Sequence, residues 1–551
     1  MNRLKRLTAS VLLAMAAAPL LAADAPRVVI ETGVLQGTSD SGIERFLGIP
    51  YAAPPVGELR WRPPQPALSW EGVRSAAEQG HACPQTIGKY KADWPNDAML
   101  AAGFDEDCLT LNIWTPADRD GPLPVMFYIH GGNMQYGSNV MPLYDGTVLA
   151  QSDVVVVIIN YRLGYLGRFA HPALRRLQAG EPLANYGLQD QIAALEWVQR
   201  NIAAFGGDPD NVTIFGHSAG GVSVNWLMVT PQSEGLFHKA IAMGSGVLLD
   251  RNQHMTETLP RGLQGLSSEQ VGAELAEYHG ISGSDAEIAA QLRALDWQQL
   301  VDYQEEVIRP FNPVIDGVIA YDHIAQIFER GDQHDVPYIG GANSWEWNQI
   351  AVDVPLIGQW FLGGALIEGL SDEDLAVFDD QWTRIGIGQR WFAEGLFLTS
   401  TRYLAKQMAT VSSPAWHYRT DYQQTAVRGQ FPGSVHGLEM PYVFGRLDEH
   451  PEYQRPPEAA EHAPSADDLL WGDTVRGYWL NMAKYGDPNG SYRGRDLPEW
   501  PEYRPDTDVT LVLDENFTPV AGLGAETLDY LEERALARRR GFDAADGNGK
   551  Q

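Results

Sequence analysis

The sequence predicts an α/β fold with a central, mostly parallel sheet flanked by helices. Two apolar, β-branched runs, LPVMFYIH (123–130) and DVVVVIIN (153–160), are typical of strands buried on both faces of a parallel sheet. The segment GLQDQIAALEWVQRNIAAF (187–205) has apolar residues at helical spacing, and GGD ends it. Strand and helix patterns alternate along the chain, which favours a doubly wound sheet.

Further segments extend this pattern. Four of them have the composition of buried strands, NVTIFG (211–216), HKAIAMGS (238–245), VPYIGG (336–341) and PAWHYR (414–419), and a helix is expected from Ser218 onward. No repeat or low-complexity linker divides the chain, so we expect one domain over residues 24–545. Residues 246–335 and 350–410 are richer in helical pattern. We predict that they form a lid, because such insertions usually cover the carboxyl edge of the sheet, where ligands bind.

The N-terminus has the pattern of a signal peptide over residues 1–23. MNRLKR is basic, and the apolar stretch from Leu12 to Ala23 ends in small residues. This stretch is too short for a comfortable membrane-spanning helix, and no other uncharged run approaches the roughly 20 residues that a bilayer requires. An uncleaved anchor helix is the alternative. We therefore expect an exported protein, either periplasmic or secreted.

Composition excludes several kinds of function. The 551 residues are 44% hydrophobic and carry a formal net charge of −31, which argues against a nucleic-acid partner because phosphate binding needs clustered Lys and Arg. Cys83 and Cys108 are the only cysteines. Export favours a disulfide between them over a metal site or two free thiols. No HExxH pattern supplies further ligands, so neither a metal nor a cofactor is expected.

GHSAG at 216–220 matches the nucleophile elbow of the α/β-hydrolase fold. Glycines on both sides permit a sharp strand-to-helix turn that raises the hydroxyl of Ser218 above the sheet edge. The pattern alone is weak, because roughly a quarter of chains of this length and composition would contain it by chance. Here a predicted strand precedes it and a predicted helix follows it, as the elbow requires. Ser218 is therefore the candidate nucleophile.

An oxyanion intermediate requires preorganised N–H donors near this serine. HGGN (130–133) directly follows a predicted strand, which places the backbone amides of Gly132 and Asn133 to act together with that of Ala219. A glycine-rich turn without a ligand is the alternative for an isolated GG pair.

A serine nucleophile also needs a base, and in this fold the acid and then the base follow the serine in the chain. His436 lies on a Gly-flanked loop in GSVHGLEMPYVFG (433–445) and is the candidate base, with a surface histidine as the alternative. Glu346, in GANSWEW after the strand-like VPYIGG, is the candidate acid. Thirteen His and 71 Asp and Glu residues compete for these roles, so position alone does not decide between them.

An ordered series of motifs runs along the chain. They are FLGIPYAAPPVGELRWRPPQP (46–66), EDCLTLNIWTP (106–116), the region from NYGLQDQ to GHSAGG (185–221), PVIDG (313–317), GANSWE (341–346), HGLEMPYVFG (436–445) and YGDPNG (485–490). In composition and order they resemble the signatures of the type B carboxylesterase and cholinesterase family, over nearly the whole chain after residue 23. The sequence looks like a bacterial carboxylesterase-like member of that family.

The resemblance implies a fold, an activity and a site. It implies an α/β-hydrolase fold with helical lid insertions, and a serine ester hydrolase without a cofactor. Ser218, Glu346 and His436 would form its triad, and Glu439 would be a buried carboxylate behind it. The oxyanion hole would be lined by Gly132, Asn133 and Ala219, Cys83 would pair with Cys108, and Arg309 and Phe311 fall where the family often builds its acyl pocket.

Several residues depart from the family's pattern. His217 precedes the nucleophile where cholinesterases carry a Glu, and Trp94 is not at the spacing to Cys108 that a choline-binding Trp would need; both departures argue against choline esters. Asn133 replaces the usual Gly or Ala, which changes shape more than chemistry because the donor is a backbone amide. Arg309 could bind a carboxylate-bearing acyl group through paired hydrogen bonds; a surface arginine is the alternative.

The sequence therefore predicts a serine carboxylic-ester hydrolase that acts through an acyl-enzyme intermediate on a small-molecule ester. Two other interpretations stay open. One is an inactive, adhesion-type member of the same fold, which the presence of all three triad residues disfavours. The other is an amide or carbamate hydrolase with the same triad. The physiological substrate and the oligomeric state are not predicted, and no nucleic acid or membrane span is expected.

Overall fold

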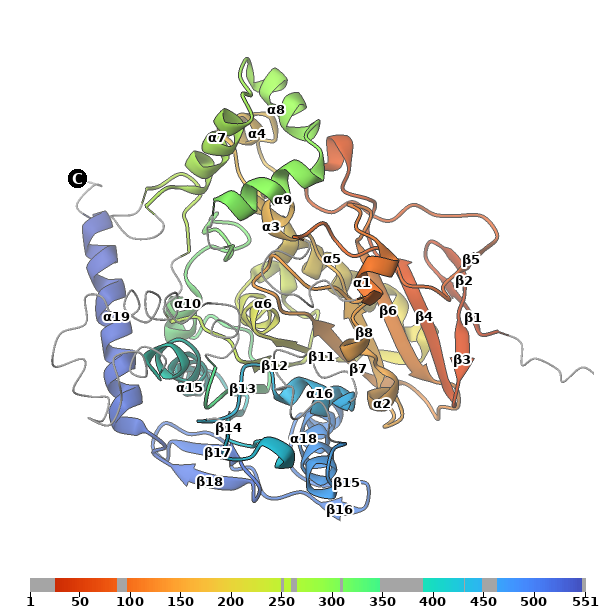
Figure 1. The fold of residues 1–551 in the computed structure, drawn as a ribbon, viewed down its shortest axis with the longest axis vertical. Coiled ribbons are helices and arrows are strands. Elements are labelled where there is room, and N and C mark those ends of the chain that lie inside the picture. The colour runs from red at the N-terminus through yellow and green to blue at the C-terminus, as the bar shows by residue number, and fades with distance from the viewer. Residues whose placement is uncertain are drawn as a thin grey trace, which may run out of the picture.

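The computed structural model describes residues 25–86, 97–248, 252–258, 265–307, 311–346, 390–430, 432–447 and 463–547. An eleven-stranded sheet in the order β18-β17-β14-β13-β12-β11-β7-β8-β6-β4-β3 forms the centre of this structure (Figure 1). Neighbouring strands from β17 to β8 are parallel. The strands at both ends pair antiparallel. The predicted α/β fold with a mostly parallel sheet is therefore confirmed.

The strands of this sheet include every segment that the sequence analysis predicted as a strand. In chain order they are β3 (Thr38–Asp40), β4 (Ile43–Pro50), β6 (Thr110–Pro116), β7 (Leu123–Ile129), β8 (Val155–Ile159), β11 (Gly207–His217), β12 (Lys239–Met243), β13 (Tyr338–Asn343), β14 (Ala415–Thr420), β17 (Val509–Leu513) and β18 (Thr518–Ala521).

The apolar runs of the central strands are continuous because both faces of the sheet are covered. Along β7, Phe127 and Ile129 point into one apolar core, while Met126 and Tyr128 point into the other. The first core lies under α5 (Tyr186–Asn201), α6 (Ala219–Leu227), α10 (Ile324–Arg330) and α15 (Thr399–Gln407). The second lies under α2 (Thr147–Ala150), α16 (Glu439–Phe444) and α18 (Ala466–Tyr485).

A group of helices extends beyond one end of these layers, in green at the top of Figure 1. It consists of α7 (Ser268–Tyr278), α8 (Asp285–Arg293) and α9 (Trp297–Glu306), packed with α3 (Gly164–Gly167) and α4 (Pro172–Leu177) around a separate apolar cluster. Ser267, Ser284 and Asp296 each begin one of the first three helices with a capping box, which fixes where each helix starts. These helices account for the middle of the predicted lid at 246–335.

Two helices of the predicted lid segments pack on the sheet. The helix α10 belongs to the first segment and α15 to the second, yet both bury their apolar side chains in the core on one face of the sheet. Helical periodicity shows that a helix has an apolar side, but it does not show which surface that side covers. Residues 350–389 of the second segment lie outside the described residues.

The remaining elements lie around this framework. They are β1 (Arg27–Ile30), β2 (Gly33–Gln36), β5 (Val73–Ser75), α1 (Asp97–Ala102), β9 (Arg168–Phe169), β10 (Ala184–Asn185), the π-helix η5 (Trp391–Leu398), β15 (Ser491–Tyr492), β16 (Arg495–Asp496) and α19 (Ala525–Gly547). Short 3-10 turns are η1 (Gly57–Leu59), η2 (Pro142–Tyr144), η3 (Ile202–Phe205), η4 (Pro231–Ser233), η6 (Met408–Thr410) and η7 (Thr425–Val427). None of the described helices combines the length and apolarity needed to cross a bilayer.

Cys83 and Cys108 form a disulfide whose Cα atoms are 5.1 Å apart. Both residues are buried in the larger apolar core and are separated by 25 positions in the chain. The expected pairing of the two cysteines is therefore present in the structure.

Replacing both cysteines with serine is expected to lower the free energy of unfolding by about 3 kcal/mol, because the unfolded chain then regains the freedom of the open loop. Urea unfolding of the oxidised wild type and of the double variant measures this difference. Reduced wild type serves as the control and should resemble the variant. Equal midpoints for oxidised wild type and variant would contradict a stabilising role for the disulfide.

Candidate active site

Ser218 lies at the turn between β11 and α6, with φ 57° and ψ −122°. Such a conformation is strained for a residue with a side chain, and it persists only where the surroundings enforce it. Two glycines make the turn possible: a Cβ on Gly216 would lie 2.5 Å from the backbone of Gly220, and a Cβ on Gly220 would lie 2.1 Å from the carbonyl oxygen of Ile129. The side chain of Ser218 is partly exposed, so the predicted nucleophile occupies a strained and accessible elbow.

The HGGN loop packs directly on this elbow. A Cβ on Gly131 would lie 3.2 Å from the Cβ of Ser218, and the next two residues have left-handed backbones, with φ 109° at Gly132 and 55° at Asn133. The carbonyl of Gly132 accepts hydrogen bonds from the amides of Gln135 (2.9 Å) and Tyr136 (2.8 Å), which holds the loop in this shape.

Three backbone amides near Ser218 are available to a ligand. Those of Gly132 and Asn133 donate no hydrogen bond to any described residue, and that of Ala219 begins helix α6. The predicted donors therefore lie on the loop that packs on the turn of Ser218 and at the N-terminus of α6, which adds its positive dipole end.

His436 and Glu346 meet in the interior. The Nδ1 atom of His436 contacts a carboxylate oxygen of Glu346, and the two residues are only 3% and 1% exposed. The other carboxylate oxygen of Glu346 accepts a hydrogen bond from the backbone amide of Asn343 at 2.6 Å. Both oxygens of the acid are therefore engaged, and its orientation toward the imidazole is fixed.

The loops that carry the acid and the base are joined to each other. The amide of Trp345 donates to the carbonyl of Ser434 (2.8 Å), and the side-chain amide of Asn343 donates to the carbonyl of Val435 (2.7 Å). These bonds connect residues about 90 positions apart in the chain and align the segments on either side of the contact. The sequence analysis did not identify Asn343, although it lies within the GANSWE motif.

The imidazole of His436 lies close to the elbow. Its ring centre is 4.4 Å from that of His217, the residue before the nucleophile. The amide of Ser218 donates to the carbonyl of Met243 at 2.9 Å, and a Cβ on the next residue, Gly244, would lie 3.3 Å from Cε1 of His436. His436 and its partner Glu346 therefore lie beside the turn that carries Ser218, at the carboxyl edge of the sheet.

A second buried carboxyl group lies behind this site. Glu439 accepts hydrogen bonds from the side-chain amide of Asn343 (2.7 Å) and from the hydroxyl of Tyr418 (3.3 Å). Burial, and then the charge of Glu346, raise the pKa of Glu439 to about 7. Burial also raises the pKa of Glu346 to about 8, against the opposing hydrogen bond from Asn343. The two carboxyl groups therefore resist being ionised together, and an imidazolium at His436 would favour the charge on Glu346.

Of the two residues predicted for the acyl pocket, the structure describes only Phe311. Phe311 is buried in the cluster of the helical extension, with its ring centre 5.0 Å from that of Tyr165. It lines a cavity of about 30 Å³ together with Met134, which follows the HGGN loop. Arg309 and Trp94 lie outside the described residues. Phe397, which the sequence analysis did not identify, packs its ring 5.1 Å from that of His436.

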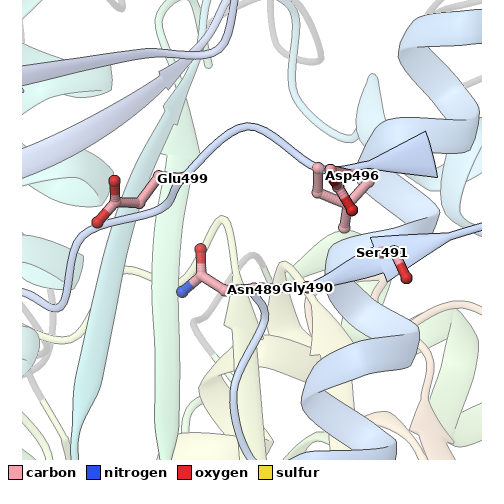
Figure 2. A pocket seen from close by; sticks show the side chains of 6 residues that line it. Asn489, Gly490, Ser491, Asp496 and Glu499 are labelled. Carbon is pink, nitrogen blue, oxygen red and sulfur yellow. The ribbon is translucent and has the colours of Figure 1, made fainter.

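A larger, open pocket of about 560 Å³ lies elsewhere, at the β15–β16 hairpin beside α18 (Figure 2). Its lining contains no histidine: Asn489, Gly490, Ser491, Asp496, Leu497 and Glu499. The side chain of Asn489 is bonded to both the amide (2.7 Å) and the carbonyl (3.0 Å) of Trp500. No group of residues that could hold a metal ion occurs in the described part of the chain. None of the residues that line this pocket belongs to the candidate site at the sheet edge.

A serine on a strained elbow at the carboxyl edge of a mostly parallel sheet is the arrangement of the α/β-hydrolases, and this chain has their fold. The chain belongs to the Carboxylesterase family, which matches residues 24–356 and 379–530. The resemblance inferred from the sequence motifs is thereby confirmed, and the protein is a carboxylic-ester hydrolase.

Individual relatives agree with this assignment. A fumonisin B1 esterase of Sphingopyxis macrogoltabida is 33% identical over 493 residues, covering 87% of this chain and 85% of the relative. A para-nitrobenzyl esterase of Bacillus subtilis is 31% identical over 508 residues, covering 89% of this chain and 95% of the relative. Among solved structures, a PNB esterase superposes with a TM-score of 0.77 at 30% identity, covering 92% of this chain and 99% of its own.

Proposed function

We propose that the protein hydrolyses carboxylic esters with a Ser218–His436–Glu346 triad and an acyl-enzyme intermediate. The observation that carries this proposal is the buried contact between Nδ1 of His436 and Glu346, next to the strained elbow of Ser218. A carboxylate at Nδ1 holds the proton on that nitrogen and keeps Nε2 unprotonated, so that it can act as a base toward the serine.

In the first half of the reaction, the hydroxyl oxygen of Ser218 attacks the ester carbonyl carbon and its proton passes to Nε2 of His436. The carbonyl oxygen becomes an oxyanion, which the amides of Gly132, Asn133 and Ala219 stabilise. The ester C–O bond then breaks, and the departing alcohol takes the proton from Nε2. The product of this half is an acyl group on Ser218.

In the second half, water attacks the acyl-enzyme and gives its proton to His436. The same three amides stabilise the second oxyanion, and collapse returns the proton to Ser218 and releases the carboxylic acid. Glu346 stabilises the imidazolium that forms in both halves, because its charge is buried beside that ring. This reaction is complete without a cofactor.

A fluorophosphonate probe tests this mechanism. We expect hydrolysis of p-nitrophenyl butyrate to stop after one equivalent of probe has reacted, and mass spectrometry to locate the adduct on Ser218. A metal chelator is the control and should leave the rate unchanged. An adduct on another residue, or loss of activity with the chelator alone, would contradict the proposed mechanism.

The substrate within the ester class is a separate question. The two relatives described above are named for different esters, so family membership does not select one. A panel of esters, amides and carbamates read as kcat/KM ranks how well each transition state is bound. We propose that esters rank first in that panel.

We also propose that the protein is exported, to the periplasm or beyond the cell. The basic start and apolar stretch of residues 1–23 support this proposal, as does the disulfide, which persists in an oxidising compartment. N-terminal sequencing of the protein from a cell fraction checks both cleavage and location.

A further inference from the structure

A second histidine is packed against the proposed base. His217 is the last residue of β11, is 6% exposed, and has its ring centre 4.4 Å from that of His436, with the two planes at 47°. A Cβ on Gly244 would lie 3.2 Å from Nε2 of His217 and 3.3 Å from Cε1 of His436. The two imidazoles therefore enclose the same small space beside the nucleophile, which follows His217 in the chain.

The two rings have different electrostatic surroundings. His436 has the carboxylate of Glu346 at Nδ1, whereas the buried Nε2 of His217 has no hydrogen-bond partner in the described part of the chain. Burial, and then the charge that His436 acquires, hold the pKa of His217 well below 6.5. When one proton enters this pair, it therefore goes to His436, and His217 stays uncharged.

The groups around His436 come from several elements. Glu346 follows β13 and contacts the ring, while Glu439 of α16 and Tyr418 of β14 lie behind it in the hydrogen-bonded group around Asn343. From the other elements come His217 of β11 and the ring of Phe397 of the π-helix, 5.1 Å from the imidazole. Glu346 favours a proton on His436, and a second anion at position 217 would favour it further.

We propose that His217 is a positioning residue for the general base. Its imidazole packs on the ring of His436. Because that imidazole is uncharged, His436 stays deprotonated down to a lower pH than it would with a carboxylate at position 217. This inference rests on the proposed function, because it concerns the proton that His436 takes from Ser218. It assigns the acid limit of the pH range in which the enzyme works to the absence of a negative charge at position 217.

Two variants of similar side-chain size separate charge from packing. For His217→Glu, we expect the acid limb of kcat/KM for p-nitrophenyl butyrate to move up by about one pH unit, because a carboxylate would stabilise the imidazolium of His436. At the low-pH end, kcat/KM of His217→Glu should therefore be about tenfold lower than that of His217→Gln. At pH values above the acid limb, the two variants should have the same kcat/KM. For His217→Gln, the limb should stay at its wild-type position, while kcat falls equally at every pH from lost ring packing.

The control is His417→Gln. His417, on β14, is another fully buried histidine, and burial lowers its pKa to about 3. Its ring contacts the hydroxyls of Thr401 and Thr510. This variant should keep the wild-type limb. His217→Asp and His217→Asn repeat the comparison with shorter side chains if the first acid variant does not fold.

Three outcomes decide the matter. Coincident acid limbs for the acid and amide variants would overturn the inference, because a charge at position 217 would then have no effect on the base. A limb displaced by His217→Gln would also overturn it, because an uncharged amide should act on the base as the uncharged imidazole does. Ser218→Ala is measured in parallel. If that variant keeps its activity, the proposed function fails; if it is inactive while the His217 limbs coincide, only the inference fails.

Discussion

Replacing Ser218 with alanine is expected to reduce kcat for p-nitrophenyl butyrate by at least about 10⁴-fold, because the variant has no hydroxyl to form the acyl-enzyme. The oxyanion donors and the binding surface stay in place, so a small residual rate over water should remain. The substitution removes the hydroxyl oxygen of a residue that is partly exposed, and the variant should therefore unfold at the wild-type temperature or above it.

The matched control for this variant is Ser223→Ala. Ser223 lies on the same helix, α6, and is buried, with its hydroxyl accepting a hydrogen bond from Gln191 at 3.1 Å. This change should alter stability by about 1 kcal/mol and leave kcat within a few-fold of wild type. A Ser218→Ala variant that keeps a tenth of the wild-type activity would show that another residue is the nucleophile.

Replacing Glu346 with glutamine is expected to reduce kcat by about 10³- to 10⁴-fold through a change of tautomer at His436. The backbone amide of Asn343 donates to one oxygen of Glu346, so the glutamine must keep its carbonyl oxygen there and turn its NH₂ group toward His436. Nδ1 of His436 then accepts a hydrogen bond and the ring proton moves to Nε2. A protonated Nε2 cannot take the proton of Ser218.

Glu439→Gln provides the control for this prediction. Glu439 is also buried and also accepts a hydrogen bond from Asn343, but its second donor is the hydroxyl of Tyr418, whereas Glu346 contacts the imidazole. We expect its kcat to fall by less than about tenfold. Steady-state kinetics of both variants at several pH values give the comparison, and equal losses would show that Glu346 has no special role at Nδ1.

The sequence predicted the central strands well because their physical cause is local. A run such as VVVII in β8 is apolar at every position since both faces of the sheet are covered, and this can be recognised from the run itself. The elbow could also be predicted, because Gly216, Ser218 and Gly220 are adjacent in the chain and their spacing is required by the turn.

The contacts between distant segments could not be predicted in this way. Glu346 and His436 are 90 positions apart; their places in the chain made them candidates, and the family resemblance was needed to choose them over many others. Asn343 joins their loops through its side chain, and no periodicity marks such a residue. Phe397 lies on a π-helix, whose spacing differs from the 3.6-residue repeat by which helical faces are identified.

The unusual backbone of Ser218, the proposed nucleophile, has a cost outside catalysis. A residue held at φ 57° and ψ −122° contributes about 1–3 kcal/mol of conformational strain, which packing elsewhere must offset. A variant selected only for heat tolerance would gain from relaxing this turn, whereas one selected for turnover cannot. Thermal robustness and rate are thus in conflict at position 218, and improvements in robustness that keep the rate have to come from residues away from the elbow.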